Sequence, residues 1–236
     1  MKSTTSIKEK ERELFSVWKS EQQYSSFISD GVFDEECYNR QDIKLLFVLK
    51  EANWENRTED LCKYLLSEES STYWKTWNNI ARWTKAILDG GDYPEHVSRA
   101  DKTFWLKKTA FLNLKKIGGG SKAKDKEIQE YAVRDKKYLL QQIELYQPDI
   151  IICCGRGKGK NADILHDTVL PKENVSEWKH PCLQYNYFIY SPSCSKEIPV
   201  LSFCHPQMWG DHVKFKKRYD EMKLIGAFLK TTYLKK

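Results

Sequence analysis

The chain has 236 residues, of which 40% are hydrophobic and 31% charged, and its formal net charge is +6 at pH 7. This composition is that of a soluble globular protein and excludes a fibrous or disordered chain. No apolar run approaches the roughly 20 residues that a membrane-spanning helix needs. The excess of basic residues favours an anionic partner such as a nucleic acid.

Helices and strands are predicted to alternate along the chain. The first helix, at about residues 7–27, has Phe15 and Trp18 on its apolar side and lies in an N-terminal helical extension over residues 1–40. Buried strands are predicted at residues 43–49, 110–113, 149–155 and 198–203, an edge strand or hairpin at 184–190, and helices at 60–66, 73–88, 100–108, 125–146, 162–170 and 211–229. This alternation predicts an α/β protein, a three-layer α/β/α sandwich with a mostly parallel central sheet, in which residues 1–236 form one domain.

The seven cysteines bear on the compartment and on metal binding. Their number is odd and no Cys-x-x-Cys pair occurs, so neither a disulfide framework nor a paired zinc site is indicated. The charged segment after Met1 does not have the pattern of a signal peptide. We therefore expect a cytoplasmic protein with reduced thiols, no metal and no other cofactor.

Three predicted strands end in side chains that can do chemistry. Glu51 follows the first buried strand, Asn113 ends the second, and His205 follows the last. The carboxyl ends of parallel strands meet at one edge of a sheet, where open α/β proteins bind their ligands, so these side chains are expected to converge. Together they offer a carboxylate, an amide that can read a base, and a hydrogen-bond donor.

Other segments have more than one interpretation. Residues 155–161 resemble a phosphate loop, but only three residues separate Gly155 from the following Gly-Lys pair, and Asn161 replaces the magnesium-binding Ser or Thr. The glycine- and lysine-rich residues 118–122 are interpreted either as a flexible loop that contacts a polynucleotide backbone or as a solvated loop. Cys204 and His205 are neighbours on a strand and therefore point to opposite sides, which disfavours thiol catalysis.

Four segments resemble, in order and spacing, the motifs of the uracil-DNA glycosylase superfamily. They are residues 49–53, 111–115, 149–155 and 203–207, and the resemblance covers residues 43–229. It implies a three-layer fold and hydrolysis of the bond that joins a sugar to a base flipped out of DNA. It also implies DNA as the partner, double-stranded with a flipped nucleotide or single-stranded, and a protein that acts as a monomer.

The resemblance also implies roles for individual residues. Glu51 would orient water or stabilise the sugar cation, Asn113 would bind the base, and His205 would donate to the leaving base. The other residues expected at the base are Ala52, Asn53 and Trp54, and those expected at the DNA are Gly119, Ser121, Lys122, Gln207, Met208 and Trp209. Gln207, Met208 and Trp209 would form a loop that wedges into the base stack.

The chain departs from the family's pattern in its first motif. Lys50 replaces a glycine, Asn53 replaces a proline, and the Pro-Tyr pair that excludes bulk from the pyrimidine ring is missing. Only Cys37 precedes this motif, so no iron–sulfur cluster is expected. We therefore expect a monofunctional glycosylase acting on a modified pyrimidine, such as the hypermodified cytosine of phage DNA, or on uracil. Lys50 is the residue that could instead attack the sugar as an amine nucleophile.

Two rival functions remain at this stage. The first is a catalytically silent DNA- or protein-binding module on the same fold. The second is a hydrolase that uses Glu51 on free nucleosides and binds DNA weakly. The first predicts that DNA binding survives loss of Glu51, and the second predicts activity without DNA.

Overall fold

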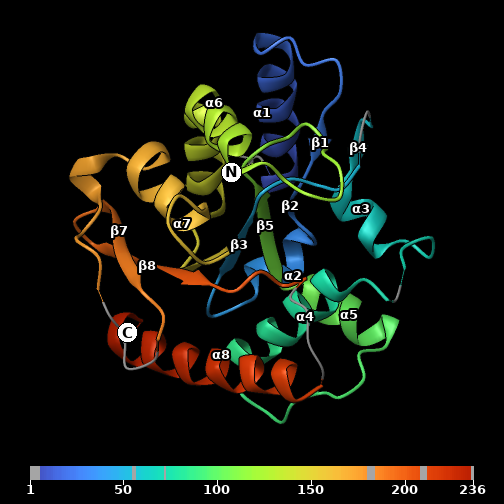
Figure 1. Ribbon diagram of the computed structural model, residues 1–236, viewed down its shortest axis with the longest axis vertical. Helices are drawn as coiled ribbons and strands as arrows, with labels where there is room; N and C mark the ends of the chain where they lie inside the picture. The colour runs from blue at the N-terminus through green and yellow to red at the C-terminus, as the bar shows by residue number, and fades with distance from the viewer. Residues whose placement is uncertain (1–5, 55–56, 72, 180–183, 208–211, 235–236) are drawn as a thin grey trace, which may run out of the picture.

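The computed structural model describes residues 6–54, 57–71, 73–179, 184–207 and 212–234. In this part of the chain, six strands form a mixed sheet in the order β2-β5-β3-β6-β8-β7 (Figure 1). The strands are β2 (Gly31–Val32), β5 (Thr109–Asn113), β3 (Leu45–Leu49), β6 (Ile150–Cys154), β8 (Lys196–Phe203) and β7 (Tyr187–Ser193). The four central strands are parallel, whereas β2 and β7 are antiparallel to their neighbours at the two edges. β1 (Ile28–Ser29) and β4 (Glu59–Asp60) pair separately.

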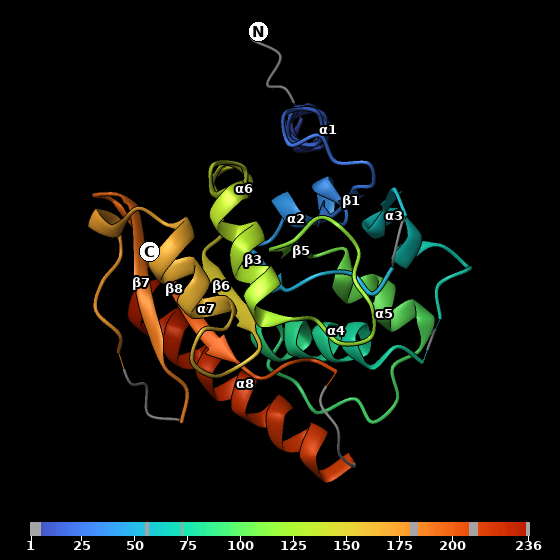
Figure 2. The ribbon, with the colours of Figure 1, turned by 45° about the horizontal axis from the view of Figure 1, so that its top comes forward.

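Helices cover both faces of the sheet (Figures 1 and 2). They are α1 (Ile7–Glu21), α2 (Glu35–Asn39), α3 (Leu61–Leu66), α4 (Lys75–Leu88), α5 (Arg99–Leu106), α6 (Asp125–Tyr146), α7 (Asn161–Ile164) and α8 (His212–Tyr233). A π-helical turn (Leu165–Val169) continues α7, and a 3-10 turn (Lys172–Asn174) follows it. No helix in the described ranges combines the length and apolar character needed to cross a bilayer.

Alternate residues of the central strands pack into two separate hydrophobic cores. Along β3, Phe47 and Leu49 belong to the core with α4 and α8, and Leu46 and Val48 belong to the core with α1 and α6. Every residue of β3, β5 and β6 is buried, as expected for parallel strands covered on both faces. The predicted α/β class with a mostly parallel central sheet is therefore confirmed.

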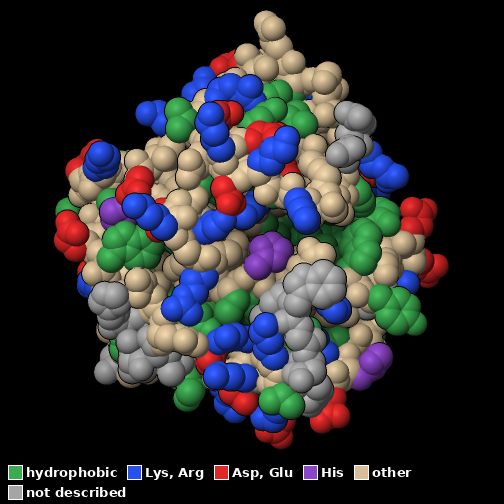
Figure 3. Space-filling model, viewed as in Figure 1, with side chains coloured by type: hydrophobic (Ala, Val, Ile, Leu, Met, Phe, Trp, Pro, Cys, Tyr) green, Lys and Arg blue, Asp and Glu red, His purple; other side chains and the backbone are tan. Residues whose placement is uncertain are grey.

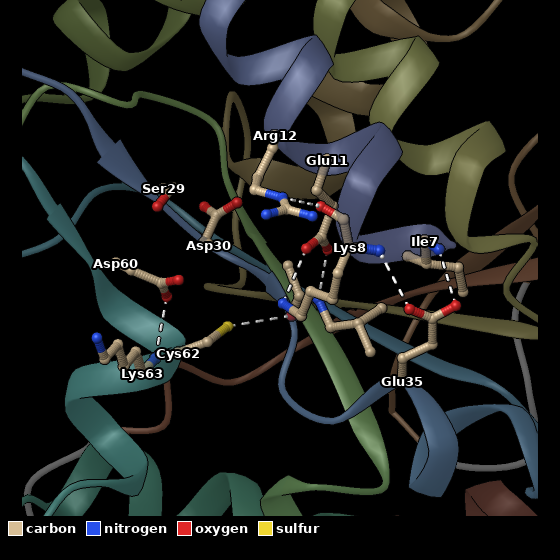
Figure 4. Close-up of polar contacts among 12 residues, drawn as sticks. Ile7, Lys8, Glu11, Arg12, Ser29, Asp30, Glu35, Asp60, Cys62 and Lys63 are labelled. Carbon is tan, nitrogen blue, oxygen red and sulfur yellow. Dashed lines mark hydrogen bonds and ion pairs between the residues drawn. The ribbon is translucent and has the colours of Figure 1, made fainter. Parts of the chain in front are cut away.

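The N-terminal region is more closely joined to the sheet than a helical extension would be. β2 pairs with β5, and the buried carboxylate of Glu11 on α1 accepts a hydrogen bond of 2.8 Å from the Val32 backbone N–H (Figure 4). Lys8 forms an ion pair of 2.8 Å with the same carboxylate, and the Ile7 backbone N–H donates to Glu35 on α2. The prediction of a purely helical segment missed the short strands, because two-residue strands have no readable periodicity.

Most predicted elements occur, with shifted ends. α6 begins and ends where the sequence places it, and β7 is the expected edge strand, joined to β8 as a hairpin. α1 ends at Glu21 rather than near residue 27, because Gln23 adopts a left-handed conformation with φ of 54°. A helix cannot continue through a residue in that conformation.

Candidate active site

The three side chains at the strand ends converge as the sequence predicts. Glu51, Asn113 and His205 line one cavity of about 540 Å³ at the carboxyl edge of the parallel strands. Glu51 and Asn113 are brought together because β3 and β5 pair in register, with Leu49 opposite Asn113. In the space-filling view, a hollow near the middle of this face is surrounded by many basic side chains (Figure 3).

Glu51 is held in an ion pair that the sequence does not reveal. Its Oε2 lies 2.7 Å from Nζ of Lys115, and the two side chains are only 6% and 5% exposed. Lys115 also contacts Glu127 on α6 at 2.6 Å. The pairing arises because the β3–β5 ladder continues past both strands, with the Lys115 backbone N–H donating to the Lys50 carbonyl at 2.9 Å. Glu51 also borders a second, lysine-rich hollow, which residues 118–122 help to line.

The glycines at residues 118–119 pack directly against the first motif. A Cβ on Gly119 would lie 2.1 Å from Oε1 of Glu51, and one on Gly118 would lie 1.7 Å from the Trp54 carbonyl oxygen. The Gly119 backbone N–H donates to the Ala52 carbonyl at 2.9 Å. These positions need glycine for close approach, so this part of the loop is neither solvated nor loosely attached. Gly119 is buried and lines the second hollow, and its contact with DNA stays a prediction.

His205 presents a defined hydrogen-bond donor. Its Nδ1 accepts from the Gln207 backbone N–H at 3.1 Å, so a neutral ring carries its proton on Nε2. Burial, and then the positive charge of Lys50, lower the pKa of His205 from its ordinary value of 6.5. The neutral ring with an Nε2–H donor is therefore the form favoured at pH 7.

Asn113 is anchored by a buried polar network. Its backbone N–H donates to Asp30 at 2.7 Å, and its side chain is 2% exposed and lines the cavity. Asp30 also accepts from Lys116 at 2.6 and 2.7 Å and from Gln142 at 2.7 Å. The side chains of Asp30 and Lys116 are fully buried, so the position of Asn113 is fixed from inside the core.

An aromatic wall lines another side of the cavity. The ring of Trp54 meets Tyr64 edge-on at 4.6 Å and Trp74 at 6.5 Å between centroids. Trp77 also lines the cavity, and Tyr73 stands at its mouth with 88% of its surface exposed. Flat aromatic surfaces of this kind stack on nucleobases whatever their sequence.

The remaining predicted residues fall into three groups. Ala52, Asn53, Ser121 and Gln207 line the cavity, and Ser121 and Gln207 are exposed at its rim. Lys122 is exposed and lines the second hollow. Met208 and Trp209, the expected wedge, lie outside the described residues.

The loop after β6 does not have the arrangement of a nucleotide-binding phosphate loop. Asn161 is fully buried, and its amide donates to the backbone carbonyls of Val48 and Cys154 at 3.2 and 2.7 Å. It joins two strands through its amide N–H groups, and its Oδ1 is buried without a hydrogen-bond partner among the described residues. Among the described residues, no group of three or more His, Cys, Asp or Glu side chains is placed to bind a metal.

Sequence reasoning missed Lys115, Asp30 and Lys116. Lys115 and Lys116 look like a solvated pair after a strand, although the apolar Leu114 and Ile117 flank them and could have indicated burial. Asp30 precedes Gly31, and an Asp-Gly pair is typical of a turn rather than of a buried ion pair. The chain matches no protein-family model and no curated protein. Its function is therefore inferred from the geometry of the site.

Proposed function

We propose that the protein is a monofunctional DNA glycosylase with a uracil-DNA glycosylase-like fold. The observation that carries this proposal is the convergence of Glu51, Asn113 and His205 on one cavity. Breaking the bond between sugar and base leaves a cation-like sugar and an anionic base. A carboxylate, an amide and a neutral imidazole donor suit these two products.

Each residue has a proposed role in the reaction. The amide of Asn113 hydrogen-bonds the edge of the flipped base. Nε2–H of His205 donates to the base as negative charge develops on it. The carboxylate of Glu51 stabilises the sugar cation and orients the attacking water. Lys50 forms an ion pair of 2.5 Å with Asp125, which supports a reaction in which it does not attack the sugar.

The proposed substrate is DNA with a modified pyrimidine, such as the hypermodified cytosine of phage DNA, or with uracil. A cavity of about 540 Å³ lies within the range of pockets that take ligands larger than a single ring. Asn53, which is exposed, and Trp54 stand where the uracil-specific branch has its Pro-Tyr barrier, so the proline of that barrier is missing here. Trp54 and Trp74 would stack on the base or on its substituent.

A scan for released bases by mass spectrometry tests this function. Wild type and Glu51→Gln are incubated with uracil-containing DNA, unmodified DNA and phage DNA with modified cytosines. We expect wild type to release one free base and Glu51→Gln to release at least about 10²-fold less. If wild type releases no base from any of these DNAs, the protein is not a glycosylase for them.

The ion pair of Glu51 with Lys115 favours a second candidate, a catalytically silent DNA-binding module. A carboxylate held by a lysine can serve structure alone. This candidate predicts that Glu51→Gln binds DNA as wild type does and that neither protein releases a base. Its DNA affinity should fall steeply with added salt, as expected for contacts to phosphates.

A further inference from the structure

Two ion clusters of opposite net charge flank the cavity. In the first, Lys115 lies between the carboxylates of Glu51 and Glu127, so these three side chains carry a net negative charge, and Lys124 acts on the outer carboxylate, Glu127. In the second, Asp125 lies between Lys50, at 2.5 Å, and Lys160, so the cluster carries a net positive charge. Both involve the start of α6, which contributes Asp125 and Glu127.

Lys50 and Glu51 face different groups although they are adjacent. Glu51 is held by Lys115 and by the close approach of Gly119. Lys50 lines the same cavity as His205 with its side chain 17% exposed, and its charge contributes to lowering the pKa of His205. One side of the cavity is the aromatic wall, beside which charges are screened less than in bulk water. Lys75, at the start of α4, also lines the cavity from the aromatic wall.

We propose that these clusters polarise the cavity, with Lys50 stabilising the anionic leaving base beside His205, and Lys115 acting as a positioning residue for Glu51. The proposal rests on the function proposed above and names two residues that deepen it. When the bond breaks, its electron pair goes to the base near Lys50, and the positive sugar is left near Glu51. Lys115 does not cancel the negative charge of Glu51, because Glu127 shares the lysine.

The distribution of charge also explains why Lys50 occupies this position. An ammonium beside His205 favours the neutral donor form of the imidazole, and it attracts the base anion that this donor binds. Asp125 keeps the ammonium in place, and its own side chain is 42% exposed, so solvent screens it more than it screens Lys50. The net field on the base side of the cavity is therefore positive.

The kinetic test uses two DNA duplexes in which the released pyrimidine carries hydrogen or fluorine at its 5-position. Fluorine makes the base a more acidic leaving group that needs less stabilisation. We expect Lys50→Met to slow release of the unsubstituted base by about 10²- to 10³-fold and of the fluorinated base by less. Lys115→Met should slow both by the same factor, with KM unchanged because Lys115 is only 5% exposed. Lys158→Met, an exposed charge-loss control, should leave both rates unchanged.

A titration of His205 by NMR tests the charge arrangement without any catalytic activity. The signal is assigned with His205→Gln, and the fold of each variant is checked by circular dichroism. We expect the pKa of His205 to rise in Lys50→Met and to stay at the wild-type value in Lys158→Met. An unchanged His205 titration in a folded Lys50→Met protein, or equal slowing of both bases by Lys50→Met, would overturn the proposal. A shifted titration together with no base release by wild type would instead remove the glycosylase function and leave the polarised cavity in place.

Discussion

Lys115 and Lys116 are adjacent in sequence and both form buried ion pairs, but their surroundings differ. Lys116 is fully buried with Asp30, and its Nζ lies 5.2 Å from the ring centroid of Trp18 on α1. Lys115 stays at the edge of the sheet beside a lysine-rich hollow and pairs with Glu51. Adjacent residues of an extended segment point in different directions, so one step along the chain separates a core residue from a site residue.

The two lysines also differ in how their charge is balanced. Burial lowers the pKa of Lys116 even though Asp30 opposes this effect. Burial also acts to lower the pKa of Lys115, but its hydrogen bonds to Glu127 and Glu51 outweigh it and the pKa is raised. Lys115 therefore hydrogen-bonds two carboxylates, whereas Lys116 hydrogen-bonds Asp30 and is acted on from farther away by Asp135 and Glu11. The Asp30–Lys116 pair should therefore matter for stability, and the Glu51–Lys115 pair should matter for activity.

The two ion pairs should differ most in the free energy of unfolding that is lost when the carboxylate of each pair is removed. We expect Asp30→Ala to lower the free energy of unfolding by about 3–5 kcal/mol, because it leaves Lys116 buried without a partner. Glu51→Ala should lower it by about 1 kcal/mol, because Lys115 keeps Glu127. Urea unfolding at pH 7, followed by tryptophan fluorescence, measures both. Equal losses would show that the two pairs are equivalent, and Asp30→Ala/Lys116→Met should recover part of the loss if the buried charge is its cause.

A methyl group added beside Glu51 should disturb the Glu51–Lys115 pair and leave the Asp30–Lys116 pair intact. In Gly119→Ala, the new Cβ would lie 2.1 Å from Oε1 of Glu51 and must displace the carboxylate from Lys115. We expect base release to fall by about 10²-fold, as for a displacement of about 1 Å in an active site. A Gly119→Ala protein that releases base at the wild-type rate would refute the close packing of this loop.

Raising the pH should change the contributions of Lys115 and Lys116 to stability in opposite directions. This is the smallest of the expected effects. With a raised pKa, Lys115 keeps its proton in the native state when the unfolded chain loses it, so its stabilisation is lost as pH rises above 10.5. With a lowered pKa, Lys116 loses its proton first in the native state, so its contribution rises with pH up to 10.5. Urea unfolding between about pH 9 and 11 should show a weaker loss of stability in Lys115→Met and a stronger one in Lys116→Met. Changes of the same sign would contradict the two pKa directions.

The sequence predicted the parts of the fold that depend on local pattern. The buried strands at β3, β5 and β6 are apolar runs long enough to recognise, and α6 has both a periodic pattern and a proline after its end. The convergence of Glu51, Asn113 and His205 followed from a general rule about parallel sheets and needed no knowledge of side-chain packing.

The parts that could not be predicted depend on contacts between distant segments. The pairing of Glu51 with Lys115 requires the register of β3 with β5, which neither segment specifies alone. The burial of Gly119 depends on how closely its loop approaches Glu51, and glycine is also the residue expected in an open loop. Asp30 joins Lys116 and Gln142 across 86 and 112 positions of the chain, beyond the reach of any local pattern.

The two-residue strand β2 has a consequence for handling the protein. It covers one edge of β5, whose residues are all buried and mostly apolar. A truncation that begins at residue 41, after the predicted N-terminal extension, would remove β2 and Asp30 together. The uncovered edge of β5 would then offer unpaired N–H and C=O groups to another chain, which is a recognised route to aggregation. Such a truncated protein should therefore precipitate on expression, and protein prepared for assay should keep the N-terminal region.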